Sequence, residues 1–183
     1  MKNTDGYMQE QIKINLQIHS TAIKYPSFRI VLDNQILDEC LDYETSTYEK
    51  QFNVDISKQQ HILKIEHFNK KPQDTLENED VAIQLQSLHF NNMKCSDVDL
   101  HEQSFYVTDW ENPPSDIIKN NLYFGFNGHY EYKFTGPTSE HLLKRDKELR
   151  KEEFQITNIN IVDEVFLDKL ESQIEFEDKT LRL

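Results

Sequence analysis

The first strong signal in the chain is a strict alternation of apolar and polar residues, which is typical of a strand with one buried face. The same period of two recurs in separate short segments, and no helical crossover is evident between them. We therefore predict an all-β fold, an antiparallel jelly-roll β-sandwich with a helical C-terminal extension. The alternating apolar residues are Ile12-Ile14-Leu16-Ile18, Phe52-Val54-Ile56, Leu63-Ile65-His67, Val81-Ile83-Leu85, Leu122-Phe124-Phe126 and Tyr130-Tyr132-Phe134.

A hairpin is indicated by the sequence FRIVLDNQIL, which begins at Phe28. Its apolar run breaks at Asp33-Asn34-Gln35 and resumes at Ile36, so two strands and a tight turn are expected. Asn34 would adopt a positive φ angle in this turn, which asparagine tolerates better than most residues. A second turn is expected at Asn127-Gly128, between the last two alternating segments.

The pattern changes after Pro137. The sequence SEHLLKRDKELRKEEF contains neither Gly nor Pro and is rich in helix formers, so we predict a helix over Ser139–Glu153 that Ser139 caps. Farther on, FQITNINIV predicts a short strand or an extended arm, and DEVFLDKLESQ predicts a second helix. We accordingly assign 1–138 to the sandwich domain and 139–183 to a helical and extended C-terminal extension.

The chain carries 33 acidic and 20 basic residues, a formal net charge of −13. Nucleic-acid binders need basic side chains massed on one face, so this charge argues against a nucleic-acid partner. The N-terminal sequence MKNTDGYMQEQ lacks the apolar core of a secretory signal, and no run approaches the ~18 apolar residues of a membrane span. We expect a soluble protein, made in the cytoplasm, with no membrane partner.

Known catalytic motifs are missing from the sequence. There is no GxSxG, no phosphate-binding loop and no Gly-rich dinucleotide turn, and the chain has only four glycines. A carboxylate pair for glycoside hydrolysis is left open, because its members can come from anywhere in a sequence. Cys40 and Cys95 form no CxxC and are expected to be free thiols. We therefore expect no enzymatic activity and, calcium aside, no cofactor.

Two groups of residues are candidates for binding. The segment between Asn69 and Asp80 contains four acidic residues, and calcium takes oxygen ligands from carboxylates and amides, so the loop is either a calcium site or a solvated acidic loop. The aromatic residues Trp110, Tyr123 and Tyr130 either belong to the core or form an exposed platform for a sugar or a partner protein.

The sequence HILKIEHFNKKPQDTLENEDVAIQLQSLHFNN, which begins at His61, resembles the central motif of the calcium-dependent, xylan-binding carbohydrate-binding modules. The resemblance implies a β-sandwich, a calcium ion bound in the 69–80 loop, and sugar contacts from aromatic residues. The chain departs from the family where Lys70 replaces an aspartate and where Gln86 stands at a late acidic position. Matching positions are His61, Leu63, Ile65, Asn69, Asp80, Ile83 and Asn91-Asn92. The residues left to hold calcium are Asn69, Asp74 and Asp80, and those left to contact sugar are Trp110, Tyr123 and Tyr130.

A second segment, IKNNLYFGFNGHYEYKFTGPTSEHLLKRDK from Ile118 to Lys147, resembles a segment shared by structural proteins of tailed bacteriophages. This resemblance implies a virion component of the head surface, neck or tail, whose partners are other virion proteins or further copies of the chain. The leading hypothesis is therefore a non-enzymatic phage structural protein located in the virion. The alternative is a carbohydrate-binding module that recognises a surface polysaccharide, with or without calcium.

Overall fold

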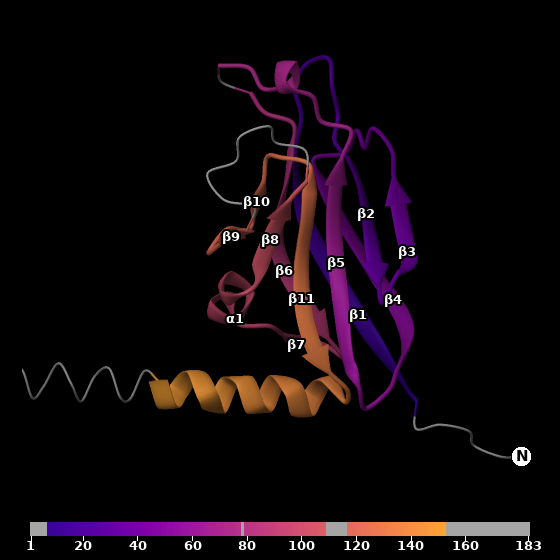
Figure 1. Cartoon of the computed structure of the whole chain (residues 1–183). Coiled ribbons are helices and arrows are strands. Elements are labelled where there is room, and N and C mark those ends of the chain that lie inside the picture. Colours follow the sequence, from indigo (N-terminus) through magenta and orange to yellow (C-terminus); the bar gives the residue numbers. More distant parts are fainter. Residues whose placement is uncertain (1–6, 78, 109–116, 153–183) are drawn as a thin grey trace, which may run out of the picture. The chain divides into compact units, whose positions relative to one another are not determined.

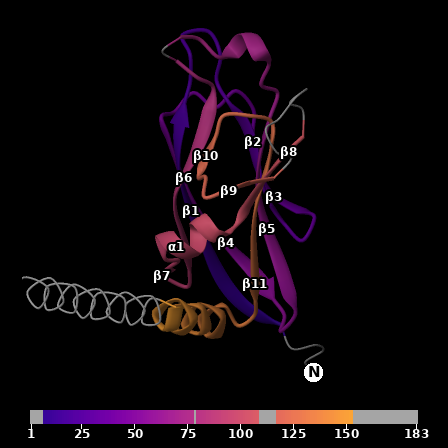
Figure 2. The ribbon, with the colours of Figure 1, turned by 60° about the vertical axis from the view of Figure 1, so that its left-hand side comes forward.

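The computed structural model of the chain describes residues 7–77, 79–108 and 117–152. Its strands form two antiparallel sheets around a shared core, which confirms the predicted β-sandwich (Figure 1, Figure 2). The strands are β1 Met8–His19, β2 Ser27–Leu32, β3 Gln35–Cys40, β4 Thr47–Ile56, β5 Gln60–Phe68, β6 Ala82–Phe90, β7 Met93–Lys94, β8 Ser104–Val107, β9 Ile117–Lys119, β10 Tyr123–Phe124 and β11 Gly128–Thr135, and two short helices are η1 Pro72–Asp74 and α1 Asp97–Glu102. One sheet has the order β10-β6-β1-β4, with β7 paired to β6, and the other has the order β3-β2-β5-β11-β8-β9.

The alternating segment near the N-terminus forms the centre of the five-stranded sheet. Its strand, β1, pairs with β4 on one side and with β6 on the other. The side chains of Ile12, Ile14 and Leu16 are fully buried, while the residues between them are half-buried on the outer face. The period of two in the sequence therefore sends one row of side chains into the core, as predicted.

The predicted hairpin joins β2 to β3. Asp33 and Asn34 both have a left-handed backbone, with φ angles of 49° and 72°. Two consecutive residues of this kind match the right-handed twist of the flanking strands, which is why Asp-Asn can stand where Asn-Gly is commoner. The positive φ angle predicted at Asn34 is confirmed, and Asp33 shares it.

The turn predicted at Asn127-Gly128 does not make a hairpin. β10 pairs with β6 in one sheet, whereas β11 pairs with β5 and β8 in the other, so the chain crosses between the sheets here. Gly128 is needed because β11 packs closely against β8, and not because of a hairpin turn. A Cβ at this position would lie 2.1 Å from the carbonyl oxygen of Tyr106, so the close pairing of β11 with β8 requires a glycine.

Aromatic side chains join the two sheets across the core. The ring of Phe134 packs on that of Phe90 with centroids 4.7 Å apart. Phe124 stacks on Phe105 with centroids 4.8 Å apart. Each pair contains one residue from each sheet, and all four side chains are buried. The alternating aromatic residues of β11 therefore belong to the core.

A helix covers residues 138–152 and begins one residue earlier than predicted. Its first backbone amide, that of Thr138, donates to both carboxylate oxygens of Glu10, at 3.1 and 3.3 Å. Glu10 lies on β1 and is only 4% exposed, so a buried carboxylate satisfies the start of the helix in place of the predicted Ser139 cap. Leu142, in the second turn, packs against the core.

The chain forms two compact units, Met1–Leu142 and Leu143–Leu183. The predicted domain boundary between 138 and 139 lies close to this division. The strand or arm predicted at 154–162 and the helix predicted at 163–173 fall outside the described residues, as does Trp110. Within the described part of the chain, no helix is long and apolar enough to cross a membrane.

Candidate functional site

A polar network lies at one end of the sandwich, where β5 leads into the loop that contains η1 (Figure 1). The β1–β2 and β10–β11 connections reach the same end. The amide of Ala22 donates to the Glu79 carboxylate at 3.2 Å, and the amide of Lys70 donates to the Asn127 side chain at 2.9 Å. These contacts hold the 69–81 loop against connections from both sides of the sandwich.

The loop leaves β5 in a defined conformation. Asn69 directly follows the strand and has a φ angle of 63°, a left-handed conformation that turns the chain. The next residue, Lys70, forms a reciprocal pair with the Asn127 side chain. Its amide donates to Asn127 Oδ1 at 2.9 Å, and Asn127 Nδ2 donates to the Lys70 carbonyl oxygen at 2.8 Å. The two hydrogen bonds with Asn127 fix the position of the Lys70 backbone.

The Lys70 side chain enters the network and is only 8% exposed. Its Nζ donates to Asp80 Oδ1 and to the carbonyl oxygen of Gly125. A Cβ at residue 125 would lie 2.8 Å from Asp80 Oδ2, so a glycine is required for the carboxylate to come this close. A buried ammonium group is tolerated when it is paired and hydrogen-bonded, and Lys70 has both kinds of partner.

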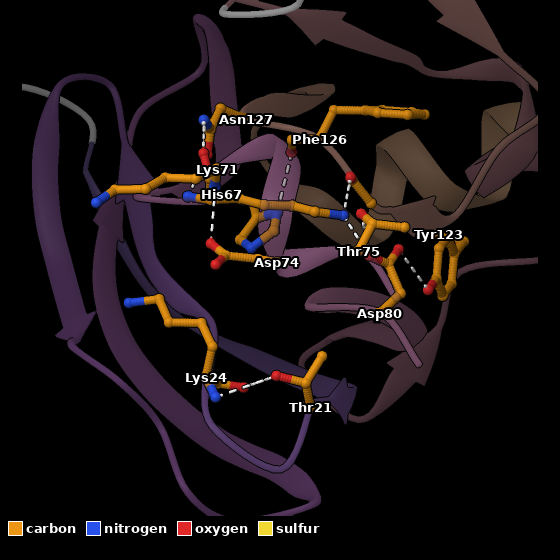
Figure 3. A network of polar contacts seen from close by, with 12 residues as sticks. Thr21, Lys24, His67, Lys71, Asp74, Thr75, Asp80, Tyr123, Phe126 and Asn127 are labelled. Carbon is orange, nitrogen blue, oxygen red and sulfur yellow. Dashed lines mark hydrogen bonds and ion pairs between the residues drawn. The ribbon is translucent and has the colours of Figure 1, made fainter. Parts of the chain in front are cut away.

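Asp80 collects the remaining hydrogen bonds of the network (Figure 3). The Thr75 hydroxyl donates to Oδ1 at 2.9 Å, and the Tyr123 hydroxyl donates to Oδ2 at 3.0 Å. Burial raises the pKa of Asp80, but the hydrogen bonds from Lys70 and Thr75 outweigh it and hold that pKa below its ordinary value. Burial and the Asp80 carboxylate together raise the pKa of Tyr123 to about 12, so the phenol stays protonated and keeps donating.

His67, the last buried residue of β5, contacts the same β10–β11 connection. Its side chain is 1% exposed, and its Nδ1 lies 2.9 Å from the carbonyl oxygen of Phe126, to which the Nδ1–H donates. Burial lowers the pKa of His67 to about 4, and the Lys70 ammonium adds to the lowering. The imidazole is therefore neutral near pH 7.

The three residues predicted to hold calcium have separate roles. Asn69 forms the turn after β5, and Asp74 accepts a hydrogen bond from the Lys71 amide at 2.8 Å, which caps η1. Asp80 is paired with Lys70. The described residues include no group of three or more His, Cys, Asp or Glu side chains placed to hold a metal ion. The set does not fit calcium, because its carboxylates already bind protein donors and an ammonium group stands beside Asp80.

Two hollows flank the Asp80 carboxylate, and Asp80 and Thr75 line both. The first, here called the Phe126 pocket, has a volume of about 350 Å³ and is also lined by Lys70, Lys71, Phe126 and Asn127. The second, here called the acidic pocket, has a volume of about 590 Å³ and is also lined by His19, Glu77, Glu79 and Tyr123. An aromatic ring and lysine side chains thus lie next to an acidic hollow.

The aromatic residues predicted to contact a sugar lie in different parts of the structure. Tyr123 lies at the site, where its ring packs edge-on against His19 with centroids 5.2 Å apart. Tyr130 is 1% exposed, and its hydroxyl donates to the carbonyl oxygen of Leu100 at 2.8 Å. The sugar contact predicted at Tyr130 is therefore wrong, because this position of β11 faces the core. Trp110 lies outside the described residues.

Sequence reasoning did not single out Thr75, Gly125, Phe126 or Asn127 as site residues. One signal was present. Two of the four glycines of the chain, Gly125 and Gly128, flank Phe126 and Asn127. In a chain so poor in glycine, two glycines three positions apart indicate close packing, which Gly125 shows against the Asp80 side chain and Gly128 shows against the Tyr106 backbone.

A second polar cluster lies at the other end of β5, around His61. The His61 Nδ1 lies 2.5 Å from Asp33 Oδ2, and its Nε2 lies 3.1 Å from the hydroxyl oxygen of Ser57. This order of groups is that of a Ser–His–Asp hydrolase relay. Nε2 also lies 3.2 Å from the Ser57 carbonyl oxygen, and the Ser57 hydroxyl oxygen accepts from the Gln59 amide at 3.3 Å, so both oxygen atoms of Ser57 have partners within this cluster. The cluster ties the β2–β3 turn to the β4–β5 turn.

No protein-family model matches the chain, and no curated protein matches it. Two solved structures are similar to it. One is the selenomethionine form of vCBM60, described in connection with a circular permutation that links two families of calcium-dependent carbohydrate-binding modules. It has a TM-score of 0.46 and 10% identity, over 67% of this chain and 89% of that chain. The other is vCBM60 in complex with galactobiose, with a TM-score of 0.46 and 8% identity, over 67% of this chain and 96% of that chain.

Proposed function

We propose that the protein is a non-enzymatic carbohydrate-binding module and that one sugar ring binds in the Phe126 pocket. One observation carries the proposal: this hollow combines an aromatic ring with polar groups at the loop end of the sandwich. A sugar ring has apolar C–H faces and a rim of hydroxyls, so an aromatic surface with a few hydrogen-bonding groups suits it. The volume of about 350 Å³ lies within the range of small-molecule sites, roughly 300–1,000 Å³.

The polar groups of the Phe126 pocket retain hydrogen-bonding capacity for sugar hydroxyls. Within the described chain, the Asp80 carboxylate accepts from Lys70, Thr75 and Tyr123. A carboxylate has about four lone-pair positions, so one acceptor position is left for a hydroxyl. Lys71 also lines the pocket and is exposed, and a lysine ammonium carries three donors. The pocket therefore offers both an acceptor and donors.

The surrounding charge favours a neutral sugar. Glu77 and Glu79 line the adjacent acidic pocket, and the whole chain has a formal net charge of −13. Both features repel an anionic polysaccharide more than they attract one. Within the proposal, the ligand is a neutral oligosaccharide or polysaccharide.

A glycan array followed by calorimetric titration of the full-length chain tests this proposal. We expect binding to at least one neutral glycan, and we expect Phe126→Ala to weaken it about tenfold or more, which corresponds to ~1.4 kcal/mol, because the ring surface is lost. Lys71→Met, which removes an exposed donor, should weaken binding severalfold. Tyr7→Ala is the matched control, since Tyr7 is 62% exposed and is not part of the pocket lining.

A loss of binding in a pocket variant counts only if that variant is still folded and the Tyr7→Ala control still binds. Phe126 also packs against the core, so its alanine variant is used only if its melting transition stays cooperative. Lys71 is exposed, so its variant tests the pocket without that complication. An array without a single neutral-glycan signal, or pocket variants that bind as tightly as Tyr7→Ala, would contradict the proposal.

The predicted role in a virion stays a prediction. The comparisons supply no observation that supports it, and the two similar structures are described as carbohydrate-binding modules. The two roles are compatible, because a particle protein can also bind a polysaccharide.

A further inference from the structure

The oxygen atoms of the loop end surround one positive group. Asp80 Oδ1 and the Gly125 carbonyl oxygen both accept from Lys70 Nζ. The hydroxyls of Thr75 and Tyr123 donate to the same carboxylate and hold it in place. Carboxylate and carbonyl oxygens are the ligands that a hard metal cation takes in proteins. Here a lysine side chain supplies the positive charge.

The lysine is built into this position and is not a mobile surface group. Its side chain is 8% exposed, and its backbone is held on both sides by the Asn127 amide. The Lys70 backbone is therefore fixed by Asn127. The ammonium group at the end of the side chain lies between Asp80, in the 69–81 loop, and Gly125, in the β10–β11 connection. A metal ion at the same oxygen atoms would stand beside a buried positive charge, which opposes its binding.

We infer that Lys70 serves as a tethered cation that takes the place of a metal ion at this end of the sandwich. Its ammonium group links the 69–81 loop, through Asp80, to the β10–β11 connection at Gly125. The loop is then ordered without a divalent metal. The inference concerns the cation only, so it stands or falls independently of whether a sugar binds in the Phe126 pocket.

Thermal unfolding of the full-length wild-type chain is the first test. We expect the melting temperature to be the same with a chelator and with about 10 mM calcium, a concentration roughly tenfold or more above the Kd of most weak protein calcium sites. A saturable, calcium-dependent rise that Asp80→Asn abolishes would overturn the inference. This measurement needs no variant that disturbs Lys70.

The second test removes the ammonium group and keeps the stem. We expect Lys70→Met to lower the melting temperature by roughly 4–10 °C, because it leaves the Asp80 carboxylate half-buried and unpaired. Lys13→Met is the matched control, since Lys13 pairs with Glu49 on the surface and both side chains are at least 40% exposed. It should shift the melting temperature by less than about 3 °C.

A double variant distinguishes an unpaired charge from a simple packing defect. Lys70→Met with Asp80→Asn should be more stable than Lys70→Met alone, because the uncompensated carboxylate is gone. Butylammonium chloride should also raise the melting temperature of Lys70→Ala, while neutral 1-butanol at the same concentration should not. Additive losses in the double variant, together with no difference between the two additives, would overturn the inference.

Discussion

A buried histidine that stays neutral makes stability depend on pH, and His67 is such a residue. Burial lowers its pKa from 6.5 to about 4. Between these two values the unfolded chain binds a proton that the folded chain does not, so stability falls as the pH falls from about 6.5 to about 4. Asp80 affects stability at lower pH than His67 does. Its folded-state pKa lies below its ordinary value of 3.8, so the stability that the charged carboxylate contributes is lost as the pH falls through that lowered pKa.

His67→Gln is expected to flatten this pH dependence. A glutamine amide can still donate to the Phe126 carbonyl oxygen, but it does not titrate. Between pH 7 and about 4.5 the wild type should lose about 2–3 kcal/mol more of its free energy of unfolding than the variant does. Urea denaturation across this range measures the difference. His101→Gln, on α1, is the control and should keep the wild-type slope, so equal slopes for all three proteins would contradict the assignment.

At the scale of single residues, the sequence predicts which side chains are buried better than it predicts what they contact. The alternation of Ile12, Ile14 and Leu16 reports burial directly, because successive strand residues face opposite sides. The sequence shows that Lys70 stands where the xylan-binding carbohydrate-binding modules have an aspartate. It does not show the hydrogen bond from Lys70 to Gly125, because these residues are 55 positions apart. Only the arrangement of the two sheets brings them together, so the site could not be assembled from the sequence.

At the scale of elements, long alternating segments were predictable and short ones were not. β1, β4, β5, β6 and β11 each span eight residues or more and carry a clear period of two. β9 has three residues, which is too few for a period to be visible, and β10 has only two, so it is shorter than the alternating segment Leu122-Phe124-Phe126 that contains it. The six-residue helix α1 has its Ser96 cap and acidic first turn in the sequence, but it is too short for an apolar stripe.

The cluster around His61 is expected to act as a structural tie and not as a nucleophile. Because the Gln59 amide holds the Ser57 hydroxyl oxygen in the β4–β5 turn and His61 is only 6% exposed, we expect no labelling of the wild type by a fluorophosphonate probe. Asp33→Asn should instead cost about 1–3 kcal/mol of stability, since Asp33 also accepts from the Ile62 amide at 2.9 Å. Stoichiometric labelling that is lost in Ser57→Ala would show a reactive serine and contradict the non-enzymatic proposal.

At the scale of the molecule, the sandwich includes the first residues of the C-terminal helix. Thr138 is fully buried, and Leu142 packs against the core. A chain ending at residue 142 should therefore unfold cooperatively with a stability within about 1 kcal/mol of a chain ending at 152. A chain ending at 137 should be less stable by about 2–4 kcal/mol, because Glu10 and the core around Leu142 lose their partners. Chemical denaturation of the three chains measures these differences.

Leu142→Ala and Leu143→Ala in the full-length chain form a matched pair for this prediction. Leu143 is 58% exposed, so its loss should cost less than about 0.5 kcal/mol, whereas the loss of Leu142 should cost about 1–3 kcal/mol. Equal effects of the two substitutions, or equal stability of the chains ending at 137 and 142, would place the helix outside the sandwich.

The bond between Glu10 and the Thr138 amide also bears on how the chain is made. The two residues are 128 positions apart, and Glu10 lies on the central strand of the five-stranded sheet. During synthesis from the N-terminus, β1 emerges with a carboxylate that stays without this partner until residue 138 has left the ribosome. Native burial of that strand thus depends on a late segment, so completion of the sandwich is expected after translation of the whole sheet region, with hydrophobic strand faces exposed until then.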